Sequence, residues 1–250
     1  MIVRCHGLNC TGEKLIEAHI IPQSFGRFIR GKRANVKLTP GRVGEAIPQL
    51  GEYDRDILCE ACDNILGLDD EYAIDICRRF EANRRDFGDV FELPGYDGGR
   101  FAKFVLSVLW RASISRRKSF ASVDLGPYQD RARDVLFGEK PLSGLGAFEV
   151  LVQRYRSIHI DTTKWLFNPE RHPFIGLNAY GFGLAGFRIL AKLDNRPLPA
   201  GYAPFVLNRS GVFRGTYVTL ENCSEFNSIV SIVRKNVKRP AAFARPKTDP

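Results

Sequence analysis

The sequence has no run of apolar residues that approaches the roughly 18 consecutive positions needed for a membrane-spanning helix. This absence excludes such a helix, and we expect no membrane partner. The first residues, Met-Ile-Val-Arg-Cys, contain no basic stretch followed by an apolar core, so we expect no signal peptide and a cytoplasmic location. Internal repeats and the glycine-rich motifs that bind nucleotide phosphates or dinucleotides are also missing.

The net charge of +9 is distributed unevenly along the 250 residues. Residues 1–100 carry a net charge of −3, whereas residues 101–250 carry +12. A basic half is typical of proteins that bind polyanions, and nucleic acid is the first candidate. A solvated basic surface without a ligand explains the same charge, and composition alone leaves both interpretations open.

Because we expect no export signal, the six cysteines favour metal binding over disulfides. Two of them lie two residues apart in Cys59-Glu-Ala-Cys62, a spacing that suits two thiolates on one metal ion. A second pair, Cys5 and Cys10, lies far upstream, and a glycine and an asparagine between its members allow a tight turn. We therefore predict one structural zinc ion held by Cys5, Cys10, Cys59 and Cys62.

One histidine lies between the two cysteine pairs. His19 falls in the strand-like run 14–21, just before Pro22. A neutral imidazole can take a proton from water near physiological pH, so His19 is a candidate general base. The alternatives are a histidine packed in a small core and an additional zinc ligand. The position between two metal-binding pairs favours the catalytic interpretation.

Residues 26–44 form a basic segment without any acidic residue. Glycines and prolines interrupt it, so we predict a long loop, or a helical turn followed by a loop. A basic loop beside a candidate catalytic histidine suits a phosphate backbone, whereas the alternative is an exposed insertion without a ligand. The predicted nucleic-acid contacts in and beside this segment are Arg27, Arg30, Lys32, Arg33, Lys37 and Arg42.

Apolar periodicity predicts the remaining elements. After Cys62 a helix is expected, with Gly67 as a point where it would divide and Cys77 on its core face. The glycine-rich residues 84–99 predict a connection and a domain boundary. Further predicted elements are helices at 101–112, 127–138 and 224–237, and strands from 148 onward and at 174–177, 184–193 and 212–220, in an antiparallel sheet.

The chain resembles the HNH nuclease superfamily of treble-clef zinc folds over about residues 1–75. The residues that carry the likeness are Cys5 and Cys10, Ala18-His19-Ile20-Ile21-Pro22, and Leu58-Cys59-Glu-Ala-Cys62. The resemblance is closest to bacterial HNH-like proteins with an extended C-terminal region, and it suggests a setting in phage or defence. In that family two strands and a helix surround a divalent ion, and the strand histidine, matched here by His19, is the general base.

The chain departs from the family pattern at three places. Ala18 stands where many members have a metal-binding aspartate, although members with alanine are familiar. The central asparagine of the family is missing, and Tyr53, Asp54 or Asp56 occupies its neighbourhood. After the second cysteine pair the family has histidine or asparagine, whereas this chain has Asp63 and then Asn64. Because hard cations prefer carboxylate oxygen, Asp63 is the candidate ligand for Mg²⁺ or Mn²⁺.

Together the sequence patterns and the resemblance imply an α+β fold in which an HNH-like zinc module of residues 1–95 precedes an α+β domain of residues 96–238 and a disordered tail at 239–250. The expected function is hydrolysis of phosphodiester bonds in nucleic acid, DNA before RNA, with His19, Asp63 and Asn64 as catalytic residues. Structural zinc and catalytic Mg²⁺ or Mn²⁺ are the expected cofactors. The alternative is a catalytically inactive zinc module that binds nucleic acid or a protein.

Overall fold

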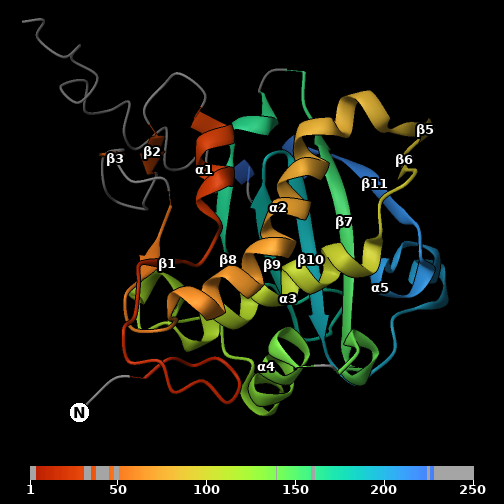
Figure 1. The fold of residues 1–250 in the computed structure, drawn as a ribbon. Helices are drawn as coiled ribbons and strands as arrows, with labels where there is room; N and C mark the ends of the chain where they lie inside the picture. The colour runs from red at the N-terminus through yellow and green to blue at the C-terminus, as the bar shows by residue number, and fades with distance from the viewer. Residues whose placement is uncertain are drawn as a thin grey trace, which may run out of the picture.

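A computed structural model describes residues 4–30, 35–37, 45–47, 51–138, 140–158, 161–223 and 226–227, with the backbone alone at 35–37 and 45–47. The fold is a mixture of helices and strands, and α2 and α3 cross one face of a large sheet (Figure 1). The helices are α1 Gln23–Arg30, α2 Glu60–Asn83, α3 Gly98–Ile114, α4 Gln129–Phe137 and α5 Leu207–Ser210. The strands are β1 Ala18–His19, β2 Asn35–Lys37, β3 Glu45–Ile47, β4 Tyr53–Asp54, β5 Arg85–Phe87, β6 Val90–Leu93, β7 Phe148–Arg156, β8 Leu166–Arg171, β9 Ala179–Leu184, β10 Phe187–Leu193 and β11 Phe213–Thr219.

Seven strands form the large sheet, in the order β5-β6-β11-β7-β10-β9-β8. All neighbours are antiparallel except β11 and β7, which run parallel and place Thr216 opposite Gln153. The sheet is therefore mixed, and the prediction of a purely antiparallel sheet was wrong at this pair. Alternation of apolar residues identifies a strand but does not encode its neighbour, and these two strands are separated by more than 50 residues.

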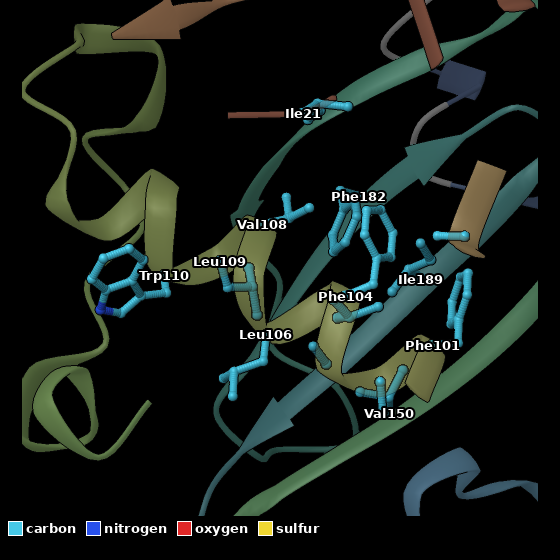
Figure 2. Packing of buried hydrophobic residues seen from close by; sticks show 14 of the residues in the cluster. Ile21, Phe101, Phe104, Leu106, Val108, Leu109, Trp110, Val150, Phe182 and Ile189 are labelled. Atoms are coloured by element: carbon cyan, nitrogen blue, oxygen red, sulfur yellow. The ribbon is translucent and has the colours of Figure 1, made fainter. Parts of the chain in front are cut away.

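Helix α3 lies at the centre of the hydrophobic core, and most of its residues are buried. It begins at an N-cap, where the Asp97 side chain accepts a hydrogen bond of 2.7 Å from the backbone N–H of Gly99. Figure 2 shows the Phe104 side chain beside Phe182 and Ile189 of the sheet. The predicted helix at 101–112 is confirmed, and its apolar stripe is the face that packs on the sheet.

Helix α2 continues without a break for 24 residues, so the division expected at Gly67 does not occur. No atom lies within 4 Å of the position that a Cβ of Gly67 would occupy, so this glycine serves no packing role. Burial of one face outweighs the roughly 1 kcal/mol by which glycine disfavours a helix. The buried apolar residues of this face are Cys62, Leu66, Ala73, Ile74, Ile76, Cys77 and Phe80, and they include Cys77 as predicted.

The N-terminal segment is more helical and less extended than the sequence indicates. The predicted strand 14–21 is reduced to the two residues of β1 and a single bridge between Leu15 and Cys59. The basic segment 26–44 begins within α1, which agrees with the predicted alternative of a helical turn followed by a loop, and in this helix Phe25 is fully buried and stacks on Phe104 with ring centroids 5.5 Å apart. Burying a phenylalanine contributes about 1.5–3 kcal/mol, which exceeds the helix penalty of the adjacent Gly26.

Residues 84–99 contain two strands rather than a connection alone. β5 and β6 pair with each other, and β6 pairs with β11 at the edge of the large sheet. The predicted boundary after residue 95 therefore falls between β6 and α3, and the core continues across it. Phe80 packs edge-on against Phe91 and against Phe187, with ring centroids 5.1 and 5.0 Å apart.

The C-terminal strands also differ from the prediction in detail. The predicted strand 184–193 contains a hairpin, because Ala185 and Gly186 adopt positive φ angles of 48° and 89° and join β9 to β10. The predicted strand 174–177 is only a bridge between Phe174 and Leu177. The predicted helix 224–237, apart from 226–227, and the tail 239–250 lie outside the described residues. α4 and β11 form where the sequence predicts them.

Candidate metal centre and adjacent histidine

The four cysteines singled out by their spacing converge in the structure. The sulfur atoms of Cys5, Cys10, Cys59 and Cys62 all lie within 4.8 Å of one another, and the Sγ atoms of Cys10 and Cys59 are 3.6 Å apart. Sulfurs bound tetrahedrally at about 2.3 Å from a zinc ion lie about 3.8 Å from each other. The donor set and its spacing therefore fit a closed site for a metal ion such as zinc.

The first cysteine pair lies on a turn shaped by two glycines. The backbone N–H of Gly7 donates to Cys5 Sγ at 3.4 Å, and that of Gly12 donates to Cys10 Sγ at 3.4 Å. A Cβ at Gly7 would overlap the Sγ of Cys62, so only glycine fits there. Asn9 adopts a left-handed φ of 54° between the two cysteines. These donors favour the thiolate form that binds metal.

The second cysteine pair lies at the N-terminus of α2, where Cys59 is the N-cap residue. The Cys59 backbone N–H also donates to Cys5 Sγ at 3.3 Å, which connects the two pairs directly. The backbone N–H of Cys62 lowers the pKa of the Cys59 thiol to about 7. Burial raises the pKa of the Cys5 and Cys62 thiols, so their deprotonation depends on a bound cation.

His19 is not one of the four clustered residues, but its segment pairs with the residue before Cys59, since the backbone N–H of Ile16 donates to the carbonyl of Leu58 at 3.0 Å. His19 is half-buried on β1, opposite Tyr53 of β4, and the two ring centroids are 5.8 Å apart. Burial lowers the pKa of His19, and the positive charge of Arg111 lowers it further. The imidazole is therefore neutral at physiological pH, as a general base requires.

A buried ion pair fixes the backbone of His19 against two helices. Arg111 of α3 donates hydrogen bonds of 3.0 and 2.7 Å to the carboxylate of Asp70 on α2. The same guanidinium donates to the backbone carbonyl of His19 at 3.0 Å. This pair was not predicted from the sequence. The sequence does contain a signal for it, since an arginine and an aspartate each interrupt the apolar face of a predicted helix.

Asp63 and Asn64 follow Cys62 in the first turns of α2, where Asp63 is half-buried and Asn64 is exposed. Burial raises the pKa of Asp63, and Arg111 opposes this shift, so the carboxylate lies within the electrostatic range of the arginine that holds His19. Among the described residues, the four cysteines are the only group of three or more close metal-ligating side chains. Asp63 belongs to no such group, so it is a candidate ligand for a second metal ion on its own.

The predicted basic contacts are described only in part. Arg27 and Arg30 are exposed on α1, and the Arg27 guanidinium donates to Gln23 of the same helix. The charge of Arg27 also contributes, after burial and Arg111, to the lowered pKa of His19. For Lys37 only the backbone is described, and Lys32, Arg33 and Arg42 lie outside the described residues.

No model of a known protein family matches this chain, and no curated protein or solved structure matches it either. None of the helices in the described part of the chain is long and apolar enough to cross a bilayer.

Proposed function

We propose that the protein is an HNH-like, metal-dependent endonuclease that hydrolyses phosphodiester bonds in nucleic acid, with His19 as the general base. The position of His19 carries the proposal. A half-buried histidine outside the four-cysteine group is held through its backbone carbonyl by Arg111, which pairs with Asp70, and Asp63 lies two turns before Asp70 on the same helix. This arrangement supports the role that the sequence resemblance assigns to His19.

In this proposal His19 removes a proton from the attacking water. Because its imidazole is neutral at physiological pH, the ring can accept that proton without first losing one. The ring lies against that of Tyr53, with centroids 5.8 Å apart, and an imidazole nitrogen would take the proton. Exposed Arg27, whose charge acts on His19, supplies positive charge that attracts a phosphate.

The two metal roles in this proposal are separate. Zinc held by four sulfurs has no open coordination position, so its role is to fix the fold. A hard cation such as Mg²⁺ binds proteins through one or two carboxylates and completes its coordination with water and substrate phosphates, which fits a lone Asp63. When bound, that cation would offset the negative charge that develops at the phosphate.

One observation favours a second candidate function, a zinc module that binds nucleic acid without cleaving it. Within the described residues, no side chains other than the four cysteines form a ready-made metal site. A protein of this second kind would bind DNA through the same basic surface and leave it intact. Cleavage of nucleic acid therefore distinguishes the two candidate functions, whereas binding does not.

The test is cleavage of plasmid DNA and of single-stranded RNA by zinc-loaded protein with Mg²⁺ or Mn²⁺. His19→Ala should lower cleavage by about 10²–10⁴-fold, the usual contribution of a general base. His172→Ala is the matched control, because His172 is another half-buried histidine but lies on the large sheet beside Arg188. Equal cleavage by wild type and His19→Ala, or no cleavage by either, would exclude this mechanism and leave the binding module.

A further inference from the structure

Three exposed cations follow α3 and lie outside the set predicted to contact nucleic acid. They are Arg116, Arg117 and Lys118, and we call them the 116–118 segment. Cations near a helix C-terminus commonly offset the helix dipole. Here α3 ends at Ile114, and the Arg117 guanidinium lies over the ring of Tyr53, 5.0 Å from its centroid. The dipole therefore does not account for where this side chain is placed.

Asp54 fixes the 116–118 segment beside the histidine strand. This residue is 6% exposed and lies on β4, and its carboxylate accepts a hydrogen bond of 2.6 Å from Ser115 Oγ. Burial acts to raise the pKa of Asp54, but hydrogen bonds from Ser115 and from the backbone N–H groups of Asp56 and Arg116 outweigh it, so the pKa is lowered. An ionised, buried carboxylate thus joins two segments about 60 residues apart in sequence.

Tyr53 connects this segment to the candidate base. It pairs with His19 across β1 and β4, and its ring is half-exposed. A second arginine, Arg55, also lies over the Tyr53 ring at 5.6 Å, but its charge is offset by an ion pair with Glu17. No acidic side chain in the described part of the chain forms an ion pair with Arg117.

We propose that the 116–118 segment is a contact surface for the nucleic-acid backbone, in which Arg117, stacked on Tyr53, binds a phosphate close to the one that His19 serves. This inference rests on the proposed function. A guanidinium stacked on an aromatic ring keeps its N–H edge free, and that edge matches the oxygens of a phosphate. Aromatic rings interleaved with arginines are also typical of surfaces that follow a nucleic-acid strand.

The experiment measures binding without cleavage, by fluorescence anisotropy of zinc-loaded protein that carries His19→Ala. The probes are a 20-base-pair DNA duplex and a 20-nucleotide single strand, each titrated at several salt concentrations. Arg117→Ala should weaken binding and flatten the slope of log affinity against log salt on the duplex by about 0.9, the value for one phosphate contact. Arg117→Lys keeps the charge and should retain most of the slope.

The matched control is Arg78→Ala, because Arg78 is exposed and lies about 29 Å along α2 from Cys59 at 1.5 Å per residue. It should leave both affinity and slope unchanged. Zinc content verifies that each variant is folded.

The outcomes separate the two proposals. An unchanged slope in zinc-loaded Arg117→Ala overturns the contact, whether or not the wild type cleaves DNA. A flattened slope in a protein that never cleaves supports the contact and excludes the nuclease. Absence of binding by the parent protein to either probe overturns both.

Discussion

Arg111 and Asp70 form a buried, two-point ion pair between α3 and α2, with N–O distances of 3.0 and 2.7 Å. The Arg111 side chain is 1% exposed, and its third contact is the backbone carbonyl of His19. One guanidinium therefore connects the core helix, the helix that carries two cysteines and the strand that carries the candidate base. The position of His19 depends on a residue 92 positions away in sequence.

Arg111→Met should lower the free energy of unfolding by about 3–5 kcal/mol, because it leaves the charge of Asp70 buried without a partner. Adding Asp70→Leu should recover most of that loss, since two apolar residues of similar volume replace a buried ion pair at little net cost. Urea unfolding of the zinc-loaded proteins measures both changes. A single substitution that costs less than about 1 kcal/mol would show that the pair is not buried as described.

Gly7→Ala should abolish metal retention, because the added Cβ would overlap the Sγ of Cys62. Gly67→Ala is the matched control, since its Cβ would meet no atom within 4 Å in the middle of α2. That control should keep the metal and raise the free energy of unfolding by about 0.5–1 kcal/mol. Zinc analysis and urea unfolding of both variants test the prediction, and full zinc retention by Gly7→Ala would argue against the described turn.

The cluster of four cysteines could be predicted from the sequence because cysteine pairs that suit a metal ion have short, local spacings. Cys59 and Cys62 are one helical turn apart, and a glycine two residues after Cys5 and another two after Cys10 supply the amides that face the sulfurs. His19 could likewise be singled out by residue type and by its place between the pairs. What the sequence could not provide was the surroundings of these residues, which come from distant segments.

The missed features are those decided by tertiary contacts. The pair of Arg111 and Asp70 depends on how two helices cross, which no local pattern encodes. In residues 84–99, Gly88 and Gly95 have positive φ angles of 67° and 82°, so they mark turns at the ends of β6 and not a linker. Composition alone does not distinguish these two uses of glycine.

His19 should titrate below 6.5, the ordinary value for histidine, because burial and the charge of Arg111 disfavour its protonated form. Arg27→Ala removes one neighbouring positive charge and should move the pKa upward, towards 6.5. NMR titration of the ring in zinc-loaded protein measures both values.

The pKa shift in Arg27→Ala also predicts the direction in which the pH dependence of cleavage changes. The base is present above the folded pKa and is lost as the pH falls through it, so the acid limb of cleavage should move to higher pH in Arg27→Ala. A His19 pKa above 6.5 in the wild type would contradict the described environment.

The metal content of the protein tests the central claim most directly, because the segment before the strand of His19 and the start of α2 meet at the four cysteines. Metal analysis combined with X-ray absorption at the zinc edge should give one zinc per chain, bound by four sulfurs at about 2.3 Å. Cys59→Ser should lose zinc or aggregate, whereas Cys77→Ser and Cys223→Ser should retain it, since both of those cysteines are buried away from the four ligands. Protein purified without chelator that holds no zinc, or zinc bound by nitrogen or oxygen in place of sulfur, would contradict the account.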